Sequence, residues 1–455
     1  MAHRSSRFFI GGRAAAGFVA LFVGACEASP GDGAKGGPDP AGGFSSDAGA
    51  ATSPPSGSDA GGALGPSKRD IELARMQAHL DSLYAQGDVV HRFETALGDD
   101  VDCLPFEKQP GFAQVGSLDG VPPVLQAEAR FDRPASLAGF GAGVDGSGRA
   151  RSCPVTAVPI RRRTLQDLEA YATLEDYLAK SPSHVRDLVD GLGFTHEHGA
   201  LTTEVANWGA QTTINLWNPA VEPHDISISQ MWVSGGNGAD HQTVEAGYEA
   251  DPDHNRGDPR PRLFVYSTTD NYNVLNNTNC FDLTCKAFVL VAGTQVLLGG
   301  RFDRASSPNG EQREFTLRWQ FCPASECRAW EGWWLRYEGG PTAEWVGFYP
   351  RSRYSANGLR DQGGRIDFGG EVGFVRGKAH TTTDMGSGEL PERGFGAAAY
   401  QTNLLRITTG HAWAPLDIMN EIIQTRGCYR VSSGQLTSQT GLLFFGGTGY
   451  SETCK

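Results

Sequence analysis

The sequence has few charged residues and no surplus of basic ones. Charged side chains make up 20% of the 455 residues, and Asp plus Glu outnumber Lys plus Arg by 52 to 39, so the formal net charge is −13. Nucleic acids and anionic membranes are bound through basic patches, so this balance argues against either as a direct partner. The length is enough for two or three domains.

Long hydrophobic runs are also missing. The apolar stretch Ala14–Val23 follows basic residues at positions 3–13 and is too short to span a bilayer. It ends in Val23-Gly24-Ala25-Cys26, and small residues directly before a cysteine resemble a bacterial lipobox. We therefore expect a signal peptide over residues 1–25 and lipidation of Cys26. Ordinary signal cleavage beside a chance cysteine is the alternative.

The segment 26–66 is poor in apolar residues. Phe44 is its only aromatic residue, and Gly, Ala, Ser, Pro and Asp dominate the rest. Such a composition cannot bury enough apolar surface to fold, so it predicts a disordered linker. The chain is thus expected to be exported to the bacterial cell envelope as a lipoprotein. Only the N-terminal lipid would touch the membrane, and processing that removes the tether would release the protein.

Cysteines are few but even in number once Cys26 is set aside. The remaining eight are typical of disulfides in an exported protein, although eight cysteines allow 105 connectivities. We prefer Cys280–Cys285 and Cys322–Cys327, which close short local loops. Cys428–Cys454 would then fix the C-terminus, and Cys103–Cys153 would cross-link an earlier region. A zinc site is the less favoured alternative, because clustered histidines are absent near the Cys-x4-Cys pairs.

Complete metal and serine-hydrolase motifs are absent as well. His196-Glu197-His198 lacks a second histidine at position 200, which the helical zinc motif needs. Asp251–Asn255 begins like a calcium loop, but Arg256 replaces the required glycine and Arg262 the required glutamate. Gly386-Ser387-Gly388 lacks the spacing of a nucleophile elbow. We expect no metal and no cofactor.

The pattern of apolar residues divides the chain into two parts. Ser67 with Asp70, and Thr164 with Asp167, are typical of capping boxes, and helical spacing follows each, running towards Leu188 after the second. From about Thr202 the pattern is short alternating strands punctuated by turns, which favours an antiparallel β-sandwich. Strands are expected at Thr212–Trp217, Ile226–Val233, Arg262–Thr268, Phe288–Leu298, Glu314–Phe321, Trp333–Tyr337, Trp345–Tyr349 and Leu404–Thr408.

Two windows in the β region place a single acid among small or apolar residues. They are Val244-Glu245-Ala246-Gly247-Tyr248 and Gly369-Gly370-Glu371-Val372. A buried carboxylate needs a partner or a proton, and two carboxyls brought together can share a proton and divide general-base and general-acid roles. Solvent-facing or salt-bridged strand residues are the alternative. The windows therefore favour a hydrolase that uses no metal.

Several segments in collinear order resemble the neprosin family. The activation-peptide signature is matched by Gly98–Cys103 with Lys108-Gln109-Pro110, and by Cys153-Pro154 with Val158–Arg162. The catalytic domain is matched by Ile214–Pro219, Ser229–Trp232, Val244–Gly247, Arg260–Phe264, Gly369–Val372, Met385–Gly388, Gly394–Gly396 and Cys428–Cys454.

The resemblance implies a glutamic peptidase zymogen. Residues 67–200 would be an activation propeptide of α+β type that inhibits its own enzyme. Residues 201–455 would be a β-sandwich, jelly-roll-like catalytic domain that cuts a peptide or protein substrate in acid, with a preference for the carboxyl side of proline. The family's catalytic glutamates map onto Glu245 and Glu371. Tyr248 and Glu249 depart from the family pattern, which leaves proline preference open.

The same windows suggest further site residues. Gln230 is a candidate oxyanion donor, because an amide needs no ionisation. Gly247 and Gly370 would leave room for a substrate backbone, and Tyr248 is a candidate substrate contact. The alternative function is a non-catalytic β-sandwich that binds peptide or glycan at the cell surface.

Overall fold

A computed structural model describes residues 65–115, 122, 125, 152–178, 180, 194–273, 278–339, 342–375, 380–416, 419–433 and 441–454. The expected signal peptide, Cys26 and nearly all of the linker lie outside the described residues. None of the described helices is long and apolar enough to cross a membrane.

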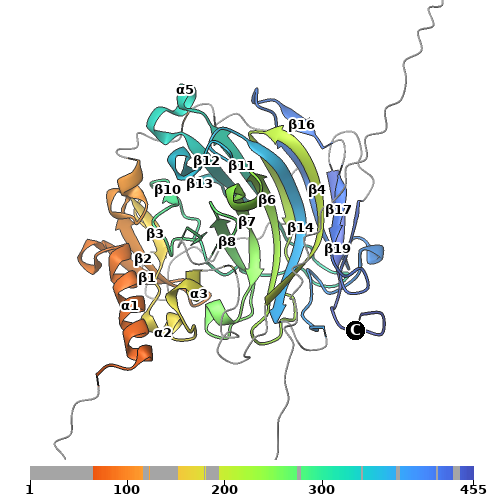
Figure 1. Ribbon diagram of the computed structural model, residues 1–455, viewed down its shortest axis with the longest axis horizontal. Coiled ribbons are helices and arrows are strands. Elements are labelled where there is room, and N and C mark those ends of the chain that lie inside the picture. The colour runs from red at the N-terminus through yellow and green to blue at the C-terminus, as the bar shows by residue number, and fades with distance from the viewer. Residues whose placement is uncertain are drawn as a thin grey trace, which may run out of the picture. The chain divides into compact units, whose positions relative to one another are not determined.

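The fold is mainly β, as predicted, with two large antiparallel sheets (Figure 1). The nine-stranded sheet runs in the order β10 (Val289–Leu290), β13 (Thr342–Pro350), β12 (Gly332–Gly339), β11 (Glu314–Cys322), β5 (Gly209–Asn215), β15 (Ala399–Ile407), β19 (Gly441–Gly446) and β18 (Arg430–Ser433), with β16 (Trp413–Pro415) paired to β15. The seven-stranded sheet runs β17 (Asn420–Ile423), β4 (Phe194–Asn207), β14 (Gly363–Val375), β6 (Ile226–Gly235), β7 (Gln242–Ala250), β8 (Arg262–Ser267) and β9 (Cys280–Phe281).

The two sheets pack face to face around one hydrophobic core. Side chains of both sheets join in it, including Trp319, Trp333 and Trp334, none of which is exposed to solvent. These tryptophans are therefore core residues. Most expected strands form, but Phe288–Leu298 supplies only the two-residue β10, because turns at Ala292–Gly293 and Leu298–Gly299 interrupt the run.

The described residues 65–180 form a small α+β unit, here called the N-terminal module. Its elements are α1 (Lys68–Leu83), α2 (Leu165–Leu168), α3 (Leu174–Leu178) and the antiparallel sheet of β1 (His91–Glu94), β2 (Asp100–Pro105) and β3 (Ala157–Arg161). They gather at one side of the sandwich (Figure 1). The module and the sandwich belong to one compact unit.

Both expected capping boxes are present, at Ser67 with Asp70 and at Thr164 with Asp167. The long second helix was wrong: the described chain bends after Leu168 and starts a new helix at Leu174. The hydroxyl of Thr173 accepts a hydrogen bond from the amide of Asp176 at 3.2 Å, so it caps the new turn. Leu188 lies outside the described residues.

The four disulfides join the cysteines in the pairs preferred from their spacing. They are Cys103–Cys153, Cys280–Cys285, Cys322–Cys327 and Cys428–Cys454. The first lies in the N-terminal module and the other three in the sandwich. Strand β4 begins at Phe194 and pairs with β14 along its length, so the division expected between residues 200 and 201 falls inside this strand. A division within 181–193 would keep β4 whole.

Candidate active site

The two singled-out glutamates lie on strands that are separated by one strand. Glu245 is on β7 and Glu371 on β14, and β6 pairs with both. Strands two positions apart are about 10 Å apart, so only side chains that converge over β6 can meet. They do converge: Glu245 is fully buried, Glu371 is 3% exposed, and both reach the same nitrogen atom. We call them the glutamate pair.

That nitrogen is Nζ of Lys180, in the N-terminal module just after α3. It donates to Glu245 Oε2 at 2.7 Å and to Glu371 Oε2 at 2.8 Å. The ring centres of Trp232 and Tyr266 lie 5.5 and 5.8 Å away, within cation–π range. Burial disfavours the charged ammonium, but the two carboxylates outweigh it and raise the pKa of Lys180. The module thus places a cation directly on the pair.

Glu371 has two further partners in the sandwich. The side-chain amide of Gln230 donates to Oε2 at 2.7 Å, and Nδ1 of His196 lies 2.5 Å from Oε1. Burial opposes ionisation of Glu371, but Lys180 and His196 outweigh it and hold its pKa well below the usual value. Gln230 is on β6, between the two strands that carry the glutamates. Its side chain therefore lies beside the pair.

Glu245 is fixed through its other oxygen. The hydroxyls of Thr243 and Tyr272 donate to Oε1 at 2.8 and 2.7 Å, while Oε2 faces Lys180. Thr243 shares the face of Glu245 because side chains alternate along β7. Tyr272 follows β8 at a turn, with a φ of 59°, and its ring stacks on Tyr266. Two hydroxyl donors therefore set the orientation of this carboxyl group.

Two expected site residues do not face the glutamate pair. Tyr248 is fully buried in the core between the sheets, where its ring meets Phe315 at 6.5 Å. A Cβ at Gly370 would meet Met385 and Phe445 at 2.6 Å, so this residue also faces the core. Their positions next to Gly247 and Glu371 in the sequence put them on the opposite face of the strand.

Gly247 does share the face of Glu245, but for a different reason than expected. A Cβ there would lie 2.0 Å from the carbonyl oxygen of Ser229 on the neighbouring strand. Glycine is therefore needed for the close approach of β6, and not for the approach of a substrate backbone.

A cavity of about 270 Å³ lies beside the pair on the same face of the sheet. Its lining includes Trp232, Thr243, Tyr272, His198 and the ion-paired Arg365 and Asp367. Since Thr243 and Tyr272 also touch Glu245, the cavity opens next to the carboxyl groups. It has room for a side chain of a bound peptide.

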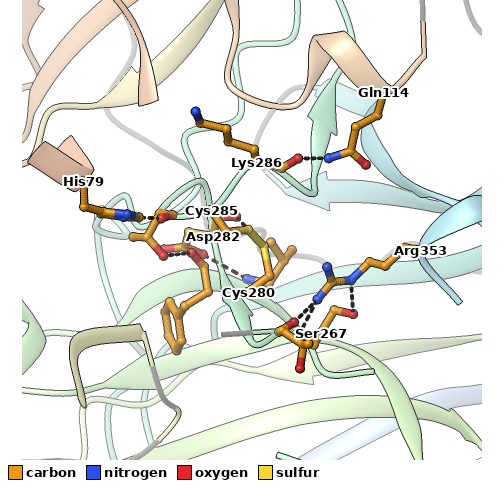
Figure 2. The surroundings of a disulfide bond; sticks show 12 residues. His79, Gln114, Ser267, Cys280, Asp282, Cys285, Lys286 and Arg353 are labelled. Carbon is orange, nitrogen blue, oxygen red and sulfur yellow. Dashed lines mark hydrogen bonds between the residues drawn. A yellow bond between two sulfur atoms is a disulfide. The ribbon is translucent and has the colours of Figure 1, made fainter. Parts of the chain in front are cut away.

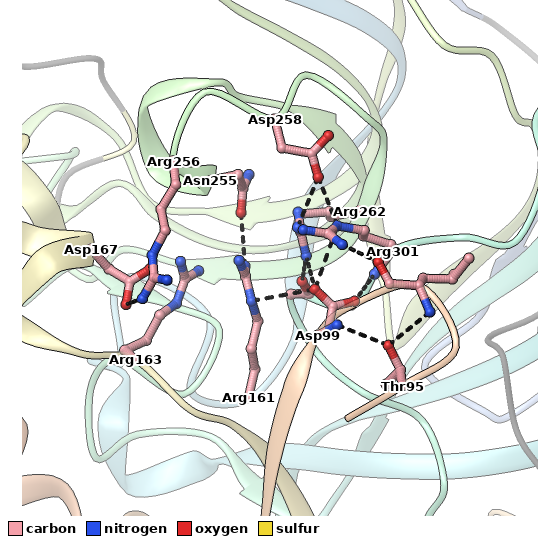
Figure 3. A network of polar contacts seen from close by, with 12 residues as sticks. Thr95, Asp99, Arg161, Arg163, Asp167, Asn255, Arg256, Asp258, Arg262 and Arg301 are labelled. Atoms are coloured by element: carbon pink, nitrogen blue, oxygen red, sulfur yellow. Dashed lines mark hydrogen bonds and ion pairs between the residues drawn. The ribbon is translucent and has the colours of Figure 1, made fainter. Parts of the chain in front are cut away.

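Ion pairs join the N-terminal module to the sandwich (Figure 3). Asp99 of the module binds Arg262 at 2.7 Å and accepts the backbone N–H of Arg301 at 3.0 Å. Asp167 binds Arg256 through both carboxylate oxygens. For each aspartate, burial opposes ionisation but the arginines outweigh it, so both pKa values lie below the usual one.

The module also holds the loop closed by Cys280–Cys285 (Figure 2). His79 of α1 makes a hydrogen bond at 2.8 Å with the carbonyl oxygen of Thr284, and the side-chain amide of Gln114 donates to the carbonyl oxygen of Lys286. Both acceptors are backbone groups. The disulfide therefore fixes a loop that the module recognises by its backbone.

The family model Neprosin matches residues 223–448, a segment that contains Gln230, Glu245 and Glu371. The chain belongs to the neprosin family over this segment, and its class is accordingly that of a peptidase. The chain is also similar to a solved structure of scytalidoglutamic peptidase with a peptide-based transition-state analogue. That likeness has 8% identity and a TM-score of 0.27, and covers 55% of this chain and 98% of that one. At this level it carries no inference about the site.

Several site residues were missed from the sequence. Lys180 stands alone in a polar stretch, and no local pattern marks it. Thr243 could have been found, because it lies two residues before Glu245 and so shares its face. His196 was noted only as part of a failed metal motif. Tyr272 reaches the site from a turn, a placement that strand periodicity does not predict.

Proposed function

We propose that this chain is a zymogen of a glutamic endopeptidase that hydrolyses peptide bonds in acid. The observation that supports the proposal most strongly is that one ammonium nitrogen, Nζ of Lys180, lies within hydrogen-bond distance of both Glu245 and Glu371. A water molecule bound at the position of this nitrogen would lie within hydrogen-bond distance of both carboxyl groups. The Lys180 ammonium thus stands in for the nucleophilic water.

The proposed chemistry begins when the N-terminal module leaves and water takes the place of Lys180. One carboxylate of the pair removes a proton as the water oxygen bonds to the scissile carbonyl carbon. The partner carboxyl is protonated and polarises the carbonyl oxygen, while the amide of Gln230 donates to the developing oxyanion. The carbon–nitrogen bond then breaks, and the leaving amine takes up a proton from the partner carboxyl.

In this proposal the N-terminal module is the propeptide and the inhibitor. Its support is threefold: Lys180 forms ion pairs with both carboxylates, Asp99 and Asp167 bind arginines of the sandwich, and the His79 side chain of α1 binds the backbone of the disulfide loop. Peptide or protein would be the substrate, and the cavity beside Trp232 would take one of its side chains. Cleavage on the carboxyl side of proline is proposed from the family resemblance.

We also propose that the chain is exported as an envelope lipoprotein through residues 1–26. Cleavage within 181–193 would separate the sandwich from both the module and the tether. The mature enzyme would then leave the membrane. Fractionation of cells before and after acid treatment tests this, and a sandwich fragment that stays with membranes would contradict it.

Self-processing tests the proposed function. Full-length protein without the signal peptide is incubated near pH 3–4, and fragments are identified by mass spectrometry. Wild type is expected to yield a fragment that begins between residues 181 and 194, while Glu371→Gln stays intact. Cleavage of Glu371→Gln at the wild-type rate would contradict the mechanism. Protein that stays intact but retains a peptide ligand would favour a binding module.

A further inference from the structure

The face of β7 that carries Glu245 carries a second buried acid, Glu249, four residues further on. Glu249 is 1% exposed, and neither carboxylate oxygen has a hydrogen-bond partner among the described residues. A carboxyl group buried in this way needs a proton or a cation. The proposed peptide hydrolysis does not use it, so its presence calls for a separate explanation.

Two other ligand-type side chains lie next to Glu249. Asp251 is 7% exposed and His254 is 3% exposed, and one ligand atom from each of the three residues lies within 4.8 Å of the others. His254 Nδ1 is 3.8 Å from Glu249 Oε1. The backbone amide of His254 donates to Asp251 at 3.0 Å, which fixes the turn that brings the imidazole back to the strand.

We propose that Glu249, Asp251 and His254 bind a divalent transition-metal cation of the Zn²⁺ type. Two carboxylates and one imidazole are a donor set that such ions accept. Zn²⁺ takes oxygen and nitrogen ligands at about 2.0–2.2 Å, so the three groups need to close by only about 1 Å. The ion would supply the partner that both oxygens of Glu249 lack.

The surroundings add charge of both signs. Asp282 is a further buried acid near Glu249, 4% exposed, but it is not one of the three residues whose ligand atoms lie within 4.8 Å of one another. Arg163 and Arg161 approach from the N-terminal module, but they donate to the carbonyl oxygen of His254 and to the side chain of Asn255. In the described part of the chain no ion pair joins either arginine to Glu249.

Protons are the competing occupants of this site. Burial raises the pKa of Glu249 well above its usual value and that of Asp251 to about 7. Metal binding needs the ionised carboxylates, so occupancy should rise with pH and fall in acid. The sequence motif that begins at Asp251 fails as a calcium loop, and the structure assigns Asp251 to a different set of ligands. The role is structural and independent of the glutamate pair.

The rings around His254 indicate what the ion would stabilise. Tyr171 and Tyr177 of the N-terminal module pack edge-on against the imidazole, with centroids at 6.2 and 5.1 Å. An ion that fixes His254 would therefore also fix the surface on which the module sits. Zinc should raise the unfolding temperature of the full chain at pH 8.

The test uses the full chain, freed of metal with a chelator and dialysed against Zn²⁺ at pH 8. Bound zinc is measured by mass spectrometry after gel filtration. One zinc per chain is expected for wild type and for the control Glu107→Gln, which alters an exposed glutamate. Glu249→Gln and His254→Gln are expected to bind at least tenfold more weakly. Glu249→Gln keeps the side-chain shape and removes a buried unpaired acid, so it should fold without zinc.

Two outcomes would overturn the proposal. One is wild type that binds no zinc at pH 8, and the other is equal zinc affinity in wild type and Glu249→Gln. In either case a proton satisfies the buried acid. Ca²⁺ binding is measured in the same way as a comparison, because Ca²⁺ prefers oxygen ligands and gains little from an imidazole. Binding of Ca²⁺ as tightly as Zn²⁺, unchanged in His254→Gln, would overturn the assigned ligand set.

Discussion

Asp99 and Arg262 form an ion pair at 2.7 Å across 163 residues of sequence, and the side chain of Arg262 is fully buried. Asp99 belongs to the N-terminal module and Arg262 to β8 of the sandwich. Arg262 is charged at any physiological pH, and it binds two carboxylates: Asp99 of the module and Asp258 of the sandwich, the latter at 3.2 Å. Docking of the module and stability of the full chain are coupled through this pair.

Asp99→Asn should therefore destabilise the full chain. Loss of one partner of a buried ion pair costs about 3–5 kcal/mol when the other charge is left unpaired. Arg262 keeps Asp258 in this variant, so we expect a loss near the lower end of that range. Denaturant unfolding in a Glu245→Gln background, which prevents self-cleavage, measures the change. Asp100→Asn is the matched control: its side chain is 52% exposed and binds Arg162 at 2.8 Å, so less than 1 kcal/mol is expected. Equal losses in the two variants would contradict this account.

A fall in pH should weaken the binding of the N-terminal module to the sandwich. The pKa values of Asp99, Asp167 and Glu371 are lowered by cations across the interface. Their contribution to stability is fully present above the ordinary carboxyl range and is lost as the pH falls through the lowered values. The unfolding temperature of Glu245→Gln should thus drop steeply below about pH 4.

The pH effect has its own control. In Asp99→Asn/Asp167→Asn the interface aspartates cannot ionise, so calorimetric scans from pH 7 to pH 2 should give a flatter curve. A Glu245→Gln curve that stays level down to pH 2 would show that these carboxylates do not govern docking.

Lys180→Met should speed activation. Methionine keeps the length of the side chain but removes the ammonium that bridges the glutamate pair, so the module loses its contact with both carboxylates. We expect self-processing near pH 4 to be several-fold faster than in wild type, measured as the rate at which intact chain disappears. Lys286→Met, an exposed lysine in the same interface, should process at the wild-type rate. An unchanged rate in Lys180→Met would show that Lys180 does not keep the zymogen inactive.

Tyr272→Phe tests a positioning role toward Glu245. A hydrogen bond to a charged group is worth about 1.5–3 kcal/mol, which corresponds to a fall of roughly 10–100-fold in kcat. KM should change little. Tyr450→Phe, an exposed tyrosine, should match wild type in kcat and in KM; an unchanged kcat in Tyr272→Phe would contradict the positioning role.

The fold was largely predictable because strand periodicity and turns are local signals. The capping boxes and the windows around Glu245 and Glu371 are local too, and the windows singled out the two glutamates, whereas Gln230 was singled out because Ser229–Trp232 resembles a family segment. It was harder to predict on which face of a strand a residue lies and which distant segment supplies its partner. Tyr248 and Gly370 were misplaced because adjacency in sequence puts a residue on the opposite face of a strand. Lys180 reaches the site through the docking of a separate module, which no nearby residue encodes.

The surroundings of the basic run Arg161–Arg163 also could not be predicted from the sequence. In sequence it is typical of a solvated surface or a processing site. In the structure Arg161 donates to the side chain of Asn255 and Arg163 to the carbonyl oxygen of His254, both in the interface. Burial of these cations depends on which hydrogen-bond acceptors the fold brings opposite them, and those acceptors lie some 90 residues away in the sequence.

The most direct test of the glutamate pair is the rate of peptide cleavage by acid-treated wild type, Glu245→Gln and Glu371→Gln, measured by mass spectrometry on matched peptides with and without proline. Each substitution keeps the shape of the side chain and removes its ability to exchange a proton. The account predicts cleavage by wild type and a loss of at least about a thousandfold in kcat/KM for each variant. Cleavage by either variant at the wild-type rate would contradict it.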